Sequence, residues 1–169
     1  MIAPPPFGFI LVTSDPATSG PRLHAWTLTQ TRMEAARWPI YASTRYKKAL
    51  SVGARLAFYV AGTGPLCGHI VGTATVLRVR IWRAGRSIDP ADFQTAPPEV
   101  VLELQDVVCL PTPVSFKDRL PALGIGTADP SRWGSLLQGG CRALDEHDWR
   151  ALLCGSSGQA EIGNLSSRA

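Results

Sequence analysis

The chain has 169 residues, 45% of them hydrophobic and 18% charged, and this composition predicts a single domain with one continuous core. The sequence has no metal-ligand spacing of Cys or His and no apolar run long enough for a membrane span or signal peptide, so we expect a cytoplasmic protein without metal or cofactor. The net charge of +4 combines a basic half, residues 1–88 at +9, with an acidic half, residues 89–169 at −5.

Residues 7–50 indicate a strand followed by two helical segments. The apolar run Phe7–Thr13 predicts a buried strand that ends at Ser14, before a loop rich in Ser, Thr, Gly and Pro. Trp26–Ala36 carries its apolar residues roughly on one side, so we expect a helix that Pro39 ends. Arg45–Leu50 is typical of a short helical turn.

Two strand-like runs, Arg55–Ala61 and His69–Trp82, come next. The segment between them, Gly62–Gly68, is rich in Gly and Pro, so the two runs are predicted to form a hairpin. The second run alternates, which separates an apolar face from a face with a basic end at an exposed edge. The apolar face holds Val71, Thr73, Thr75, Leu77, Val79 and Ile81, and the other face holds Gly72, Ala74, Val76, Arg78 and Arg80.

The remaining sequence predicts two strands and a closing helix. Cys141–Leu144 indicates a short strand, and Asp145 begins a helix in which Asp148 completes a variant of the capping box before Gly155 ends it. Glu99–Val108 alternates like a strand with one buried face. Its core-facing residues are predicted to be Val100, Leu102, Leu104 and Val108, and its outward residues Glu99, Glu103 and Gln105.

These elements predict an α+β fold, a twisted, mostly antiparallel sheet curled into a partial barrel with flanking helices. We expect residues 1–6 to be an N-terminal extension and residues 7–154 to form the domain. Residues 155–169 carry too little apolar surface to offset the entropy of ordering, so we expect a disordered tail.

Basic residues concentrate in one stretch of the chain. Residues 35–88 contain no acid, and such a field attracts polyanions. The alternative is that an arginine-rich chain has scattered, solvated charges. The nine bases are Arg37, Arg45, Lys47, Lys48, Arg55, Arg78, Arg80, Arg83 and Arg86.

Common catalytic motifs are absent from the sequence, among them G-x-S-x-G, H-E-x-x-H, the P-loop and G-x-G-x-x-G. Gly62-Thr63-Gly64 joins two strands and precedes no helix, so a hairpin turn is favoured over a phosphate loop. Asp106 falls on the apolar face of its predicted strand, but no catalytic partner is identifiable, so we expect a structural carboxylate. The sequence therefore predicts a binding protein and not an enzyme.

Trp38 differs from the other tryptophans because it lies between a helix and a basic turn and is followed by Pro39. A tryptophan held in this way presents a rigid flat face, and such faces stack extruded bases beside basic grooves. The alternative is ordinary core packing, which is expected for Trp149 in the closing helix.

Several segments occur in a specific order: Phe9–Ser14 as the opening strand, Trp38 after the first helix, Val52–Tyr59 as a glycine-led strand, Arg132-Trp133, and Cys141–Asp148 at the end. In this order they resemble an EVE domain, a PUA-like module similar to the YTH domains that read methylated adenine. The resemblance covers about residues 7–153. Two positions depart from the pattern, because Ala54 stands in place of the usual acid and Ile10 in place of the usual tryptophan.

The resemblance implies a pocket that holds a flipped-out, modified (methylated) base of DNA or RNA. Trp38, with Pro39, would form the stacking wall and Trp133 a second wall. Thr13 and Ser14 would hydrogen-bond the base edge. Tyr59 is a further candidate, for which core packing is favoured. The residues expected to hold phosphates are Arg45, Lys47, Lys48, Arg78 and Arg80.

Two other classes of function remain open. One is a DNA- or RNA-processing enzyme of the wider PUA-like or ASCH-like group, in which Lys47 and Asp106 would have to converge on the pocket. The other is a protein-interaction module that uses an apolar groove. EVE-like modules occur near modification and restriction systems and in RNA metabolism, so either role is open, and a base-binding domain of this kind is expected to need an effector protein, such as a member of a modification or restriction system.

Overall fold

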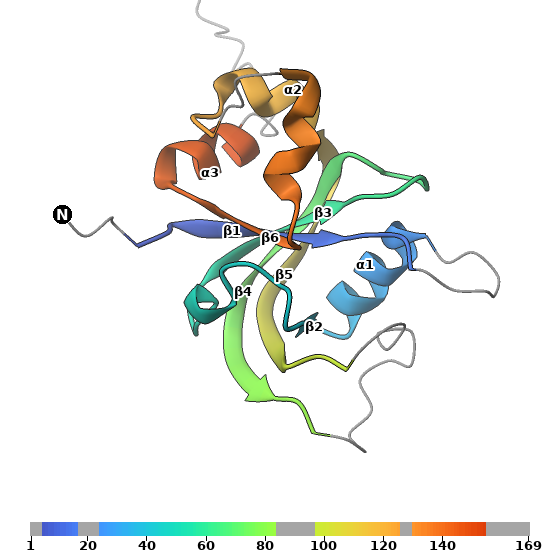
Figure 1. Ribbon diagram of the computed structural model, residues 1–169, viewed down its shortest axis with the longest axis vertical. Helices are drawn as coiled ribbons and strands as arrows, with labels where there is room; N and C mark the ends of the chain where they lie inside the picture. The colour runs from blue at the N-terminus through green and yellow to red at the C-terminus, as the bar shows by residue number, and fades with distance from the viewer. Residues whose placement is uncertain (1–4, 17–23, 84–96, 126–129, 155–169) are drawn as a thin grey trace, which may run out of the picture.

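The computed structural model describes residues 5–16, 24–83, 97–125 and 130–154, so the predicted tail at 155–169 lies outside the described residues. Six strands form one mixed sheet in the order β2-β5-β4-β3-β1-β6, which curls into a half-barrel (Figure 1). All neighbours are antiparallel except β1 and β3. The predicted twisted, mostly antiparallel sheet, curled into a partial barrel, is therefore confirmed. The strands are β1 (Gly8–Thr13), β2 (Arg37–Ile40), β3 (Arg55–Val60), β4 (His69–Ile81), β5 (Val100–Ser115) and β6 (Cys141–Leu144).

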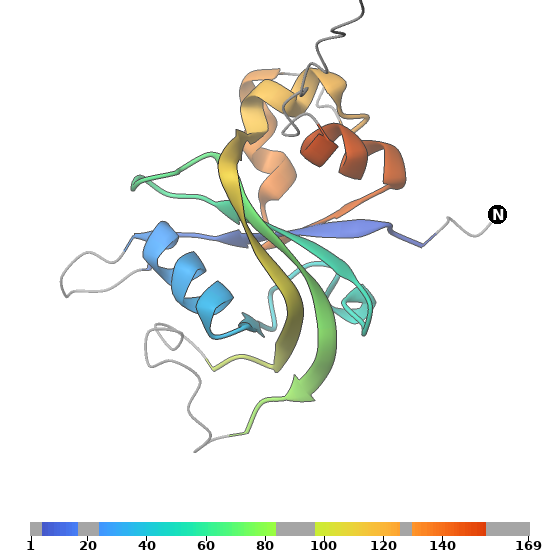
Figure 2. The same cartoon turned by 180° about the vertical axis from the view of Figure 1, so that it is seen from behind.

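Helices lie on both sides of this sheet. In Figures 1 and 2, α1 packs on one side beside β2, whereas α2 and α3 gather on the other side of β1 and β6. No helix in the described ranges is long and apolar enough to cross a membrane. The helices are α1 (Ala25–Glu34), α2 (Phe116–Arg119) and α3 (Glu146–Leu153), with the 3-10 segments η1 (Lys47–Ala49), η3 (Leu120–Ala122) and η4 (Pro130–Leu137).

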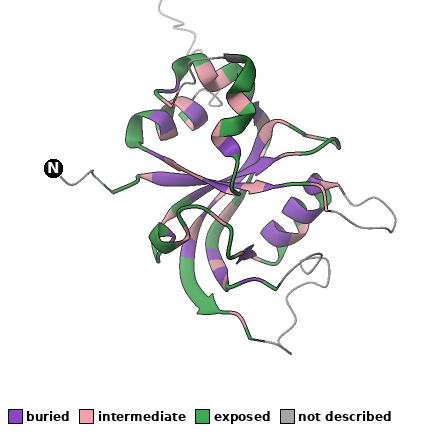
Figure 3. Ribbon diagram, in the orientation of Figure 1, coloured by how far each residue is buried: buried purple, intermediate pink, exposed green. Residues whose placement is uncertain are grey.

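The central strands separate two apolar cores, and this explains why their sequences are almost continuously hydrophobic. Along β1, Phe9 and Leu11 face the first core, inside the half-barrel, while Ile10 faces the second core under α2 and α3. In β3, Phe58 faces the first core and Tyr59 the second. Figure 3 shows the resulting buried centre.

The predicted hairpin is present as β3 and β4, and the predicted closing strand coincides with β6. The Asp145 carboxylate caps α3 by accepting from the Asp148 backbone N–H at 2.8 Å. Asp148 does not complete the box, because its own carboxylate accepts from the Gly124 N–H at 2.5 Å and thereby ties α3 to the preceding loop. Pro39 follows the end of α1 but lies inside β2, a strand that the sequence did not indicate.

Strict alternation fails along β4 and β5, because the register between them shifts three times. Asp106 adopts a positive φ of 52° and is exposed, so the prediction that it lies on the apolar face is wrong. Beyond this irregularity Val108 is 49% exposed, against the prediction that it faces the core. At the far end of β4, Leu77 and Ile81 are also exposed, on the part of the strand that extends past β3.

Candidate functional site

A groove of two adjoining cavities opens where β1 ends. The two cavities share Val12, Gly139 and Gly140, and we name each after its most distinctive residue. The arginine lobe, about 220 Å³, is further lined by Arg32, Trp38, Pro39, Ile40, Tyr41, Ser43 and Thr44. The tyrosine lobe, about 290 Å³, is further lined by Ser14, Tyr59, Ala61, Trp133, Gly134, Leu137 and Gln138.

The wall between the lobes is the glycine pair before β6. Gly139 and Gly140 have φ values of 88° and 75°, a backbone region that favours glycine. The Gly139 carbonyl accepts from the Arg45 N–H at 2.9 Å, and the Gly140 carbonyl accepts from the Val12 N–H at 3.0 Å. A side chain on Gly139 would collide with the Arg45 side chain. The pair therefore joins β1 to the loop before η1 and leaves both lobes open.

The tyrosine lobe is built on the second core. Phe116 packs edge-on against Tyr59, with ring centroids 5.7 Å apart, and lies 5.9 Å from the ring of Trp133. Burial, and secondarily the nearby Cys67, raises the pKa of Tyr59 to about 12, so its hydroxyl stays neutral at physiological pH. Within the described residues this hydroxyl makes no hydrogen bond. Tyr59 thus presents a hydrogen-bonding group to the lobe.

Ser14 and Thr13 end β1 but have different environments. Ser14 is exposed and lines the tyrosine lobe, whereas Thr13 is buried and lines neither lobe. The Thr13 hydroxyl accepts from the Arg32 guanidinium at 3.4 Å. Of these two predicted hydrogen-bonding residues, only Ser14 has its side chain in the groove.

Asp15 fixes the chain just after β1. Its carboxylate accepts from the backbone N–H groups of Ala25 and Thr63 at 2.9 and 2.8 Å, and from the Thr63 hydroxyl at 3.0 Å. These hydrogen bonds, the one from Ala25 first, lower the pKa of Asp15. Asp15 thereby joins the start of α1 to the β3–β4 turn and holds Ser14 at the groove.

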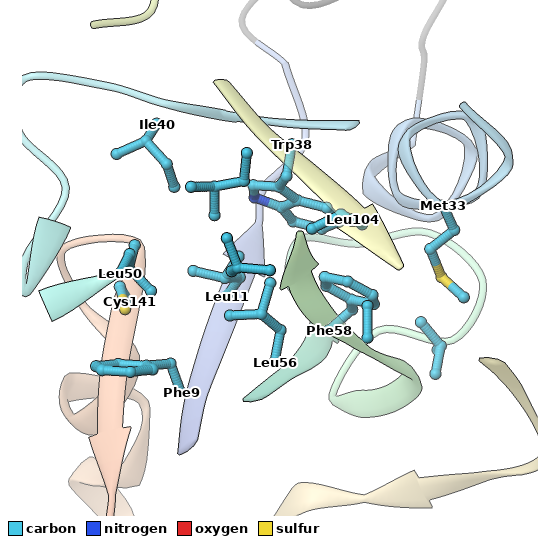
Figure 4. Close-up of a cluster of buried hydrophobic side chains, with 14 of the residues drawn as sticks. Phe9, Leu11, Met33, Trp38, Ile40, Leu50, Leu56, Phe58, Leu104 and Cys141 are labelled. Carbon is cyan, nitrogen blue, oxygen red and sulfur yellow. The ribbon is translucent and has the colours of Figure 1, made fainter. Parts of the chain in front are cut away.

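In the arginine lobe, Trp38 belongs to the first core. Its ring stacks on Phe58 with centroids 4.4 Å apart and planes 12° apart, and the residue is only 2% exposed (Figure 4). The guanidinium carbon of Arg32 lies 5.2 Å from the ring centroid. Trp38 and Pro39, both predicted to bind the base, line this lobe. The Trp38 ring, however, is stacked on Phe58 and almost fully buried, so it has no open face for a base.

None of the five predicted phosphate-binding residues lines either lobe in the described part of the chain. Lys47 forms an ion pair with Glu99 at 2.6 Å. Arg80 lies 2.6 Å and Arg78 3.9 Å from the carboxylate of Glu103 on β5. Two acids from the acidic half of the chain therefore offset part of the basic surface. Lys48 is exposed, and Arg45 borders the groove through its contact with the glycine pair.

The proposed enzymatic pair does not form at the groove, because neither Lys47 nor Asp106 lines it. Across the described lining residues there is no His, Cys, Lys or carboxylate. Asp145, His147 and Asp148 bring possible ligand atoms within 4.8 Å of one another, but the two carboxylates already accept backbone hydrogen bonds that cap and anchor α3. The three residues therefore lie close together because they form the start of α3.

Sequence reasoning missed two contributions to the groove. Arg32 lies inside a helix, where an arginine has no distinguishing local pattern, and only the packing of α1 beside β2 brings it to Trp38. The Gly139-Gly140 pair was a visible turn signal, but its role as the wall between two cavities depends on contacts with β1 and Arg45.

Comparison with known proteins finds the likeness only in structure, since no protein-family profile and no curated protein matches the sequence. The N-terminal domain of Staphylothermus marinus McrB superposes with a TM-score of 0.56 at 10% identity, covering 87% of this chain and 93% of that domain. A hypothetical protein of Leishmania major gives 0.54 at 13% identity, covering 89% and 94%. A protein of Agrobacterium tumefaciens gives 0.50 at 15%, covering 88% and 92%. These likenesses establish a shared PUA-like fold.

Proposed function

We propose that this protein is a nucleic-acid-binding module that takes a flipped-out base, methylated or otherwise modified, into the tyrosine lobe. The observation that carries the proposal is the meeting of Ser14, Tyr59 and Trp133 in one cavity of about 290 Å³, although they come from three distant segments of the chain. The PUA-like fold shared with the McrB N-terminal domain supports the proposal at the level of the fold.

The chemistry of the tyrosine lobe suits a base. Trp133 is half-buried, so part of its ring remains accessible for stacking, an interaction worth about 1–3 kcal/mol per base. The neutral Tyr59 hydroxyl and the Ser14 hydroxyl can each donate or accept a hydrogen bond at the base edge. Val12, Ala61 and Leu137 add apolar surface that favours a methyl group by about 0.8 kcal/mol per buried carbon.

Binding without catalysis is the second part of the proposal. General acid–base or nucleophilic chemistry needs a titratable group within hydrogen-bond reach of the substrate. The described lining residues include only Arg32, Tyr41 and Tyr59 as titratable side chains. Arginine and tyrosine side chains ordinarily keep their protons at neutral pH, and burial raises the pKa of Tyr59 further, to about 12, so none of the three is suited to proton transfer there. Any effector step would then belong to a partner protein.

The test is retention of nucleosides. Immobilised protein is incubated with enzymatic digests of cellular DNA and of RNA at low salt, and retained nucleosides are identified by mass spectrometry. The Trp133→Leu variant removes the stacking ring, and Trp149→Leu is the matched control because Trp149 is also half-buried but lies in α3 outside both lobes. Thermal melting confirms that both variants are folded.

Enrichment of one base by the wild type and by Trp149→Leu, lost in Trp133→Leu, would support the proposal and name the ligand. Retention of no nucleoside, or equal retention of all of them by all three proteins, would contradict it, and any binding of oligonucleotides would then be electrostatic. In that case oligonucleotide affinity would fall steeply between about 50 and about 200 mM salt without any dependence on base identity.

A further inference from the structure

The far end of β4 extends beyond its neighbour β3 and leaves one edge of the strand open. Pairing between the two strands ends at Thr75. The chain before β3 reaches only Val76, whose N–H donates to the Ala54 carbonyl and whose carbonyl accepts from the Gly53 N–H. Because Gly53 has a φ of 85°, extended pairing stops there. In Figure 1 the arrowhead of β4 projects past the end of β3, and Figure 3 colours it as exposed.

The open edge, residues 77–81, carries backbone groups that have no partner in the described part of the chain. In a strand that is paired on one side, alternate residues direct their N–H and C=O groups to the other side. The Trp82 N–H donates to the Glu99 carbonyl on the side of β5, so by alternation Val79 and Ile81 direct theirs away from β5. The open edge can therefore accept one further strand.

The open edge continues an apolar row of the first core. The register shift at Leu77 acts as a bulge, so that Val79 lies opposite the buried Leu102 and takes over the inward position that Val76 holds in the regular part of the strand. The row is buried as far as Val76, but Leu77, Val79 and Ile81 are 44%, 38% and 76% exposed. An apolar strip thus lies beside the unpaired backbone groups.

A second unpaired edge, along β5, is protected where the open edge is not. β2 pairs only with residues 100–103 of β5. Further along β5, Asp106 has a positive φ, and Pro111 and Pro113 have no N–H to donate. Such irregularities and prolines prevent another strand from pairing. Residues 77–81 contain neither proline nor glycine, so the open edge lacks this protection.

Charge decides which kind of strand fits. Arg78 and Arg80 share the single carboxylate of Glu103, and the exposed Arg83 follows, so the open edge carries excess positive charge. If two copies of the chain paired antiparallel about Val79, Arg78 of each copy would lie opposite Arg80 of the other. Like charges directly opposite each other destabilise a sheet. An acidic strand would instead meet complementary charge.

We propose that the open edge of β4 is a docking site for an extended, acidic segment of a partner protein, which adds a strand to the sheet through backbone hydrogen bonds at Val79 and Ile81. Side chains of the segment alternate, with apolar residues beside these two positions and carboxylates beside Arg78 and Arg80. No residue of β4 lines either lobe of the groove, so this docking site is independent of base binding.

The probe is a fluorescein-labelled peptide in which glutamate alternates with valine, and a peptide with lysine in place of every glutamate is its charge control. Binding to the whole chain is followed by fluorescence anisotropy at low salt, and exchange of backbone amides by NMR. In the free protein the amides of Val79 and Ile81 should exchange faster than that of Arg80. The glutamate peptide should slow both by about tenfold or more and bind about tenfold or more tightly than the lysine peptide.

Val79→Glu should weaken binding of the glutamate peptide by about tenfold or more, because it places a like charge in the apolar strip. Val108→Glu is the matched control, since Val108 is a similarly exposed valine of β5 outside the open edge and the substitution changes the net charge equally; it should preserve the affinity. If the NMR spectrum shows that Val79→Glu is unfolded, N-methylated peptides decide. Methylation at all valines or at all glutamates removes donors from one edge of the peptide, so only one of the two should abolish binding.

Three results would overturn the proposal. One is a glutamate peptide that does not bind, or that binds and leaves the amides of Val79 and Ile81 unprotected. Another is equal binding of the lysine peptide, which would exclude an acidic preference. The third is protection of both amides in the free protein together with concentration-dependent dimers in sedimentation, which would show that a second copy occupies the open edge. Each result can be obtained whether or not nucleosides are retained, so the docking site and the base-binding function are tested separately.

Discussion

Replacing Trp38 by alanine should destabilise the whole domain. The residue is 2% exposed and its ring stacks on Phe58 at 4.4 Å, so the substitution removes a core side chain together with an aromatic pair. Truncating a buried tryptophan or phenylalanine to alanine costs about 3–5 kcal/mol, a large part of the roughly 5–15 kcal/mol that stabilises a typical domain. At about 2–4 °C per kcal/mol for a domain of this size, Tm should fall by about 6–20 °C.

Urea unfolding followed by far-ultraviolet circular dichroism measures this loss. The Trp26→Ala variant is the control, because Trp26 is only partly buried against the same core and should cost clearly less. A loss below about 1 kcal/mol for Trp38→Ala would refute the core assignment and make the ring available as a stacking wall. If the large loss is found, weak ligand binding by Trp38→Ala reports unfolding, and Trp133 becomes the informative position for base binding.

Three further predictions concern the residues that shape the groove. Gly139→Ala should lower stability by about 1–3 kcal/mol because φ is 88° there and the new Cβ meets the Arg45 side chain, whereas Gly134→Ala, with open space around its Cβ, should be neutral or slightly stabilising in thermal melts. Because the pKa of Asp15 is lowered in the folded protein, its carboxylate should stabilise the fold above pH 3.8, and this stabilisation should be lost as the pH falls through the pKa of the folded state. Asp15→Asn should therefore be less stable than wild type at neutral pH, and the difference in unfolding free energy should narrow in acid unfolding curves. Ultraviolet absorbance should show Tyr59 losing its proton near pH 12 in the folded protein, against about pH 10 in the unfolded chain. Its contribution to stability should therefore decline as the pH rises from about 10 to about 12. An unchanged dependence of stability on alkaline pH in Tyr59→Phe would contradict this.

Local sequence patterns were sufficient for most of the elements. The apolar runs at β1 and β3 and the Gly/Pro-rich turn after β3 predicted the strands and the hairpin, because a strand buried on both faces must be almost entirely apolar. The Asp145 cap predicted the start of α3. A curled, mostly antiparallel sheet with flanking helices followed from the order of these elements, whereas the PUA-like kind was implied by the resemblance to EVE domains; the superposition on the McrB N-terminal domain agrees with both.

Alternation was a poor guide where the chain departs from regular pairing. It placed Val108 and Asp106 on the core face, but the positive φ of Asp106 and the shifts in register between β4 and β5 change which residues face inward. Such irregularities depend on how two strands fit together across the curved sheet, and a single strand's sequence carries no signal for them.

The sequence by itself determined which residues are candidates for the groove, because Ser14, Trp38, Tyr59 and Trp133 stand out by chemistry and by their position at the ends of elements. Only the tertiary structure decided the environment of each. Trp38 turns out to be packed on Phe58, while Trp133 lines a cavity beside Tyr59. The physical reason is that the availability of an aromatic face depends on what covers it, and the covering residues come from segments far away in the chain.

Charge shows the same division. Counting along the chain located a basic half, but Glu99 and Glu103 come from the acidic half and pair with Lys47, Arg78 and Arg80 once β5 packs beside β4 and β2. The one arginine drawn into the groove, within the described residues, is Arg32, which the packing of α1 buries beside Trp38. The amount of charge follows from the sequence alone. Where that charge can act on a ligand depends on burial and ion pairing, and these depend on the distances between elements in the folded chain.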